Sequence, residues 1–113
     1  MSLQSIGPLY MDLPDRRLSD VGRWVEDLGY DTLFVGDHVL SYVDGLTAVA
    51  AMAGGTSRLK LGTAVYLLAL RDPVLVARSL ATLAMELPDR FVLGVGVGGD
   101  LPEEFEVLGI DVH

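Results

Sequence analysis

Cysteine is absent from the 113 residues of this chain, and histidine occurs only as His38 and His113. The lack of cysteine excludes disulfide bonds and thiolate chemistry. It is compatible with a reducing cytoplasm, where we expect the protein to reside. Two histidines without any cysteine leave too few ligands of the kind that zinc prefers. We therefore expect no metal site.

Positive charge is also scarce. Eight basic residues stand against 16 acidic ones, which gives a formal net charge of −8. The basic residues are scattered and form no stripe that could follow a phosphate backbone, so nucleic acid is not an expected partner. No long hydrophobic run is present either, because residues 61–70 reach only about half of the roughly 18 apolar residues that a membrane helix needs. The first residues lack a basic segment followed by an apolar one, and we expect neither a signal peptide nor membrane insertion.

Short apolar runs alternate with helical patterns along the chain. Strands are predicted at 5–12, 32–35, 59–65 and 91–97. Helices are predicted up to about residue 28, at 44–53, at 73–87 and from residue 102 onward. The last three strands are apolar on both faces, which is typical of a parallel sheet covered by helices. The chain is therefore predicted to be a single α/β domain.

Two architectures are built from such units, the open doubly wound sheet and the (βα)8 barrel. Both place functional residues outside the carboxyl ends of the strands. Three unusual stretches fall at this edge of the predicted sheet: 36–38 (GDH), 64–66 (AVY) and 98–100 (GGD). Their common location is the first indication of a functional site.

Asp37 and His38 directly follow the second predicted strand. One interpretation is a pair at a pocket, in which His38 donates a proton or a hydrogen bond and Asp37 fixes the loop, because imidazole titrates near neutral pH. The other is that Asp37 caps a turn and His38 lies on the surface. Adjacent residues on a strand point to opposite faces, so at most one of the two is expected to face a ligand.

The glycine-rich run at 94–99 contains the spacing Gly-x-Gly-x-x-Gly. A dinucleotide-binding loop requires this spacing to open directly into a helix, whereas Gly94 and Gly96 fall inside the fourth predicted strand. We therefore reject that interpretation. Glycine inside a strand indicates that something packs close to the backbone, either a flat ring or a tightly packed helix.

Two further groups of polar residues have simple explanations. Thr63 could donate a hydrogen bond to a ligand, or it could be present only because threonine favours strands. The acidic residues Glu103, Glu104 and Glu106 are interpreted as the solvated face at a helix N-terminus, where carboxylates are favourable.

Three stretches together resemble the luciferase-like oxidoreductase family. They are DLGYDTLFVGDH at 27–38, TSRLKLGTAV at 56–65 followed by RDPV at 71–74, and LATLAMELPDRFVLGVGVGG at 80–99 followed by PEEF at 102–105. The resemblance implies a TIM-like (βα)8 barrel, of which residues 1–113 supply about the first four βα units as one partial domain, a half barrel. It also implies a cofactor, FMN or the deazaflavin coenzyme F420, and hydride transfer with a small organic substrate.

By the same resemblance, His38 is the catalytic residue and contacts the cofactor ring or the substrate. A cis peptide bond between Ala64 and Val65 is expected behind the ring. The cofactor-binding residues implied by the resemblance are Asp37, His38, Thr63, Ala64, Val65, Gly96, Val97 and Gly98.

The glycine-rich run followed by Pro-Glu-Glu-Phe is most similar to the F420-dependent branch. Some sugar-phosphate dehydrogenases of that branch carry a catalytic glutamate where this chain has Gly99, so their chemistry is not expected here. An FMN-dependent monooxygenase is the first alternative, and a non-catalytic flavin-binding or structural relative is the second. A half barrel leaves strand edges unpaired, and we expect either a homodimer or the missing C-terminal half of the barrel to cover them.

Overall fold

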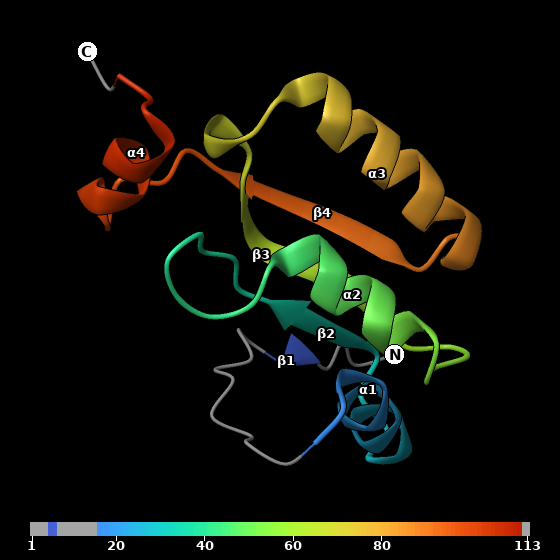
Figure 1. Cartoon of the computed structure of the whole chain (residues 1–113). Coiled ribbons are helices and arrows are strands. Elements are labelled where there is room, and N and C mark those ends of the chain that lie inside the picture. Colours follow the sequence, from blue (N-terminus) through green and yellow to red (C-terminus); the bar gives the residue numbers. More distant parts are fainter. Residues whose placement is uncertain (1–4, 7–15, 112–113) are drawn as a thin grey trace.

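The computed structural model describes residues 5–6 and 16–111. Strands and helices alternate, and the four strands form one parallel sheet in the order β1-β2-β3-β4. Figure 1 shows this arrangement. The elements are β1 (Ser5–Ile6), α1 (Leu18–Asp27), β2 (Thr32–Val35), α2 (Gly45–Ala53), β3 (Lys60–Leu67), the 3-10 helix η1 (Leu68–Leu70), α3 (Pro73–Glu86), β4 (Phe91–Gly96) and α4 (Pro102–Leu108).

Local sequence signals fix the starts of two helices. The Asp44 carboxylate accepts a hydrogen bond from the backbone N–H of Thr47 at 2.9 Å and caps α2. The Asp72 carboxylate caps α3 by accepting from two backbone N–H groups, and Pro73 occupies the first helical position. The predicted start of α3 at residue 73 is confirmed.

The third strand ends at Leu67, later than predicted. Residues 7–12 of the first predicted strand lie outside the described residues.

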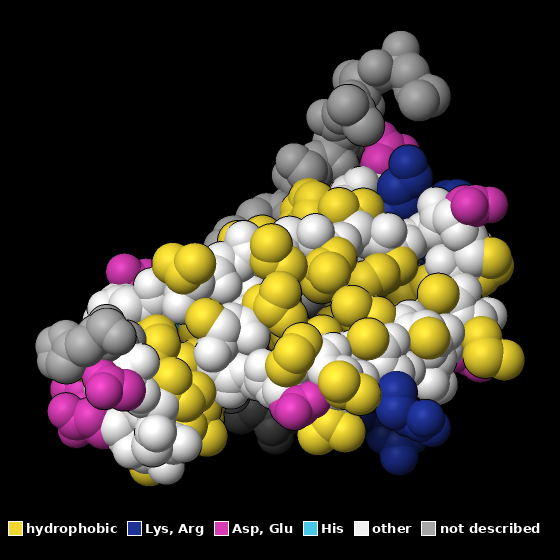
Figure 2. Space-filling view, turned by 90° about the horizontal axis from the view of Figure 1, so that it is seen from above, with side chains coloured by type: hydrophobic (Ala, Val, Ile, Leu, Met, Phe, Trp, Pro, Cys, Tyr) yellow, Lys and Arg dark blue, Asp and Glu magenta, His cyan; other side chains and the backbone are white. Residues whose placement is uncertain are grey.

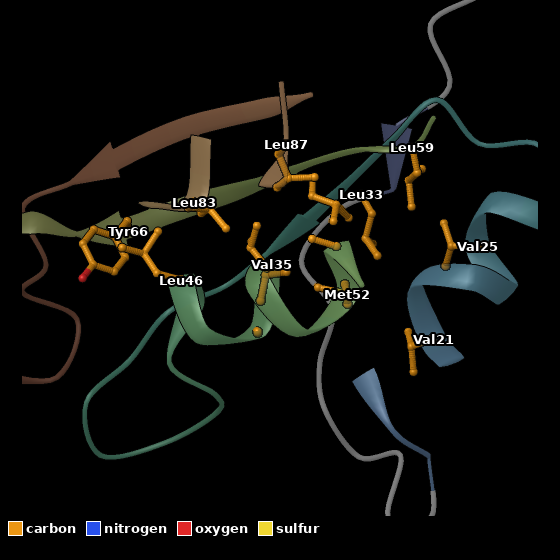
Figure 3. Close-up of a cluster of buried hydrophobic side chains, with 14 of the residues drawn as sticks. Val21, Val25, Leu33, Val35, Leu46, Met52, Leu59, Tyr66, Leu83 and Leu87 are labelled. Carbon is orange, nitrogen blue, oxygen red and sulfur yellow. The ribbon is translucent and has the colours of Figure 1, made fainter. Parts of the chain in front are cut away.

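The strand order decides between the two architectures left open by the sequence. A doubly wound sheet reverses its strand order at a switch point, whereas here each strand pairs with the next one in sequence. Side chains of α1, α2 and α3 form one core cluster with β2 and β3 (Figure 3). Consecutive parallel strands with a helix layer on one side are the geometry of a (βα)8 barrel. The core is formed by residues such as Val21, Val25, Leu33, Val35, Val49, Met52, Leu59 and Leu61.

The surface around α3 and β4 is markedly hydrophobic. Val92, Leu93 and Val95 of β4 are 38%, 37% and 51% exposed, and within the described residues β4 pairs only with β3. Figure 2, the view from the top of Figure 1, shows a broad area of hydrophobic side chains. The described helices include none that is long and apolar enough to cross a membrane. This half barrel thus presents apolar surface that is ordinarily covered by protein.

Candidate functional site

The loops after β2, β3 and β4 meet at one edge of the sheet, together with α4. The side chain of Asp37 reaches the backbone of Leu67 at the end of β3. The space beside Gly98 is filled by Phe105 of α4 and by Leu67. Leu67, Leu70 and Phe105 form a small buried cluster beneath this edge. The loops at the carboxyl ends of the strands, where the sequence predicted a functional site, therefore pack against one another and against α4.

Asp37 is buried, and four hydrogen bonds satisfy its carboxylate. One oxygen accepts from the backbone N–H of Gly45 and the other from that of Leu67, each at 2.9 Å. The guanidinium of Arg71 donates to both oxygens, at 2.8 and 2.9 Å. Such bidentate pairs are among the strong charge-assisted hydrogen bonds. Asp37 thus holds the loop after β2 against the start of α2 and the end of β3, which agrees with the interpretation that it fixes loop geometry.

Both terminal nitrogens of Arg71 donate hydrogen bonds at this edge. Besides Asp37, its guanidinium contacts the Asp44 carboxylate at 3.3 Å and the carbonyl oxygen of Leu67 at 3.1 Å. It also lies over the ring of Tyr66, 4.3 Å from the centroid. Burial tends to raise the pKa of Asp44, but hydrogen bonds from Thr47 and the charge of Arg71 outweigh burial and lower it. Sequence reasoning assigned no role to Arg71, because its partner Asp37 lies far away along the chain.

His38 is held by Glu104 of α4. Its Nδ1 atom lies 3.2 Å from each oxygen of the Glu104 carboxylate. The same carboxylate accepts from the backbone N–H groups of Val39 at 2.6 Å and Leu40 at 3.1 Å. The His38 side chain stays 22% exposed, and the ring of Tyr42 lies 5.2 Å from it, centroid to centroid. Of the adjacent pair, Asp37 is enclosed and His38 keeps access to solvent.

The prediction that Glu104 lies on a solvated helix face is wrong. Glu104 is 1% exposed, because α4 packs Glu104 and Phe105 inward, while Glu103 and Glu106 are exposed as predicted. Burial tends to raise the pKa of Glu104, but hydrogen bonds from Leu40, His38 and Val39 lower it below its usual value. A signal was present in the sequence, since Leu101, Glu104, Phe105 and Leu108 follow the spacing of one helix face.

A cis peptide bond joins Ala64 and Val65, at the position that the family resemblance implies. The register between β3 and β4 shifts between Thr63 and Tyr66. A Cβ atom at Gly94 would collide with the carbonyl oxygen of Thr63, and one at Gly96 would collide with the side chain of Val65. The glycines of β4 are therefore explained by the close approach of β3, and neither a ring nor a helix is needed to account for them.

The predicted cofactor residues differ in their surroundings. The hydroxyl of Thr63 donates to the carbonyl oxygen of Gly94 at 2.8 Å and its side chain is buried, so donation to a ligand would require this bond to break. Val65 and Val97 are 41% and 76% exposed. Gly98 has φ +76°, a conformation that favours glycine. Contact of these residues with a cofactor stays a prediction. Within the described residues, no group of three or more His, Asp or Glu is placed to hold a metal ion.

A family model described as luciferase-like monooxygenase matches residues 6–113. The chain belongs to this family. It is 33% identical over 96 residues to a 4-hydroxyprotoasukamycin monooxygenase of Streptomyces nodosus subsp. asukaensis, an alignment that covers 81% of this chain and 26% of that protein. It is 36% identical over 95 residues to an F420-dependent glucose-6-phosphate dehydrogenase of Kineococcus radiotolerans, covering 77% of this chain and 28% of the relative.

Solved structures of luciferase-like enzymes share the fold. The oxygenating constituent of 3,6-diketocamphane monooxygenase from Pseudomonas putida, in complex with FMN, superposes with a TM-score of 0.81 at 20% identity, over 98% of this chain and 34% of that one. The F420-dependent tetrahydromethanopterin reductase of Methanopyrus kandleri gives a TM-score of 0.68 at 24% identity, over 96% and 30%. These neighbours are TIM-barrel enzymes, and the chain corresponds to a half domain with parallel strands. It spans about a quarter to a third of the length of its relatives.

Proposed function

We propose that this chain forms one wall of the cofactor-ring site in an F420-dependent oxidoreductase that transfers hydride between the deazaflavin and a small organic substrate. The observation that carries the proposal is His38, a partly exposed imidazole held by a buried carboxylate at the carboxyl ends of the strands. A general acid or base needs such a fixed yet accessible group.

The residues at this edge fit a flat ring. Val65 and Val97 offer exposed apolar side chains, whereas the space beside Gly96 and Gly98 is already taken by Val65 and Phe105. When bound there, the cofactor would supply the hydride chemistry. The chain itself would orient the ring with the apolar wall, hold the loop after β2 through Asp37, and exchange a hydrogen bond or proton at His38.

The preference for F420 rests on the glycine-rich run followed by Pro102 to Phe105, and relatives that depend on F420 support it. FMN is the alternative cofactor, supported by the FMN complex of the 3,6-diketocamphane monooxygenase and by the monooxygenase relative. Gly99 argues against sugar-phosphate dehydrogenation, for the reason given by the family resemblance. We propose the cytoplasm as the location, in line with the absence of cysteine.

The test is to titrate each cofactor into a protein in which this chain forms part of a complete barrel. Binding is monitored by the absorbance of the cofactor. We expect F420 to bind and FMN to bind far more weakly. Replacing the exposed valine of the wall, Val97→Asp, should reduce F420 affinity at least tenfold, because a charge would be desolvated against the ring. The matched control is Val107→Asp, at an exposed valine of α4, which should leave affinity unchanged.

Other outcomes identify the alternatives. Tight binding of FMN without affinity for F420 would assign the protein to the FMN-dependent monooxygenases. Binding of neither cofactor would favour a non-catalytic relative.

The hydrophobic surface around β4 is expected to be buried against protein, and we propose that the remaining strands of a barrel bury it. A second copy of the chain is the alternative, and the intact mass and solution mass of the protein distinguish the two.

A further inference from the structure

Glu104 accepts hydrogen bonds from two backbone N–H groups, and its carboxylate lies 3.2 Å from Nδ1 of His38. We propose that Glu104 is a positioning residue that fixes the neutral His38 ring in the tautomer with hydrogen on Nδ1, so that Nε2 offers its lone pair to a ligand. The sequence interpretation treated His38 as a donor. The contacts of Glu104 assign the neutral ring the opposite role at Nε2.

The two oxygens of Glu104 have different surroundings. Oε1 accepts from the backbone N–H groups of both Val39 and Leu40. Nδ1 of His38 lies 3.2 Å from both oxygens, and within the described residues it is the partner of Oε2. An ionised carboxylate has no hydrogen to donate, so a hydrogen bond between Oε2 and Nδ1 requires that Nδ1 carries the hydrogen.

Glu104 is well suited to remain ionised. Its side chain is 1% exposed, so water cannot replace the three protein donors. Two of these donors are backbone N–H groups of residues 39 and 40, which cannot act as acceptors. Hydrogen bonds to the charged form favour ionisation, and the lowered pKa of Glu104 agrees with this.

The other ring nitrogen is left for a ligand. Among the described residues no hydrogen-bond partner of Nε2 is found, whereas the ring is 22% exposed. In the neutral ring with hydrogen on Nδ1, Nε2 is an acceptor. A ligand group that donates a hydrogen, such as a hydroxyl, is therefore favoured at this position. This consequence rests on the proposed function, whereas the assignment of the tautomer does not.

The test compares the ring nitrogens of His38 by ¹⁵N NMR in the wild-type chain and in Glu104→Gln, at a pH high enough for the imidazole to be neutral. In the variant, the amide oxygen can still accept from Val39 and Leu40, so the amide NH₂ takes the place of Oε2 and donates to Nδ1. This NH₂ favours the tautomer with hydrogen on Nε2, while the amide oxygen, equally near Nδ1, still accepts from the other tautomer. We expect the wild type to show the Nδ1–H pattern and Glu104→Gln to show a clear shift toward the Nε2–H pattern.

Two controls make the result specific. Glu103→Gln removes the same charge from the adjacent, exposed residue and should leave the pattern of the wild type unchanged. His113→Ala removes the second histidine, so that the remaining signals belong to His38. Cofactor is absent from these measurements, and their outcome is thus independent of the cofactor titration.

Either of two results would overturn the proposal: hydrogen on Nε2 in the wild type, or an unchanged pattern in a Glu104→Gln variant whose amide spectrum shows a folded chain. If that variant does not fold, the wild-type spectrum alone decides. Once an activity has been measured for a protein in which this chain forms part of a complete barrel, Glu104→Gln should lower its kcat at least tenfold and leave cofactor affinity unchanged. Glu103→Gln should change neither quantity.

Discussion

Buried carboxylates fix both ends of the sheet, but they do so with different partners. At the amino-terminal end of β3, Glu26 of α1 accepts hydrogen bonds from the backbone N–H groups of Ser57, Arg58 and Leu59, and from the hydroxyl of Ser57. At the carboxyl-terminal end, Asp37 binds two backbone N–H groups and a guanidinium. Of these three carboxylates, Glu104 is the one that lies against a partly exposed imidazole, that of His38.

The difference separates structural support from a functional site. The donors of Glu26 are backbone and hydroxyl groups with no chemistry to offer a substrate. Glu104 binds two backbone N–H groups in the same manner and in addition orients an imidazole. A buried carboxylate alone is therefore no sign of a site. The informative feature is an accessible titratable partner beside it.

The largest effect on stability is expected for Asp37→Asn. The substitution places an amide NH₂ against the donors of Arg71 and leaves this partly buried guanidinium with Asp44 as its remaining anion. Breaking a buried pair costs about 3–5 kcal/mol, and we expect a loss toward the lower end of that range. The matched control is Asp44→Asn, which removes the exposed partner of the same arginine. Asparagine caps helices well, and we expect a loss below about 1 kcal/mol. Urea denaturation of both variants measures the difference, and equal losses would show that Asp37 is no more important than Asp44.

A smaller effect that depends on pH is expected at the amino-terminal end. Burial tends to raise the pKa of Glu26, but hydrogen bonds from Arg58, Leu59 and Ser57 lower it from 4.5 to about 2. Because the pKa is lower in the folded chain, the stabilisation is complete above the unfolded value and is lost as pH falls from about 4.5 to about 2.

Glu26→Gln should therefore cost roughly 2–3 kcal/mol at neutral pH. The difference from the wild type should shrink as the pH is lowered through that window. Unfolding measured across the acid range provides the check, with Asp27→Asn, the next residue in α1 and an exposed one, as the control. A difference that stayed constant with pH would contradict the assigned cause.

The smallest effect on stability is expected for His38→Ala. Without the imidazole, Glu104 keeps its bonds from Val39 and Leu40, so the free energy of unfolding should fall by about 1 kcal/mol or less. In a protein with a complete barrel, turnover should fall about 10²-fold or more, as for loss of a general acid or base. His113→Ala serves as the control for both measurements. Unchanged turnover would show that His38 has no part in catalysis.

The alternation of strands and helices could be predicted because its signals are local. Asp72 and Pro73 begin α3 without help from the rest of the fold. The end of β3 was predicted too early, because the apolar run continues past Val65 with no glycine or proline to mark the end of the strand.

The contacts of the site depend on residues far apart in sequence, and periodicity does not reveal them. The Asp37–Arg71 and His38–Glu104 pairs form only when the strand ends meet. The position of Asp37 and His38 at the edge was predictable, and so was the loop-fixing role of Asp37. Their partners were not. Glu104 shows why: a glutamate next to exposed acidic residues is assigned to the surface unless the apolar spacing of its own helix face is considered.

The shared carboxylate of Asp37 has a consequence for hydrogen exchange. The amides of Gly45 and Leu67 belong to different elements, yet each donates to an oxygen of the same side chain. A fluctuation that releases this side chain exposes both amides to solvent in one event, because neither keeps its acceptor when the carboxylate moves away. Their exchange rates would then report one local opening equilibrium, and this opening would be the motion that frees the loop carrying His38.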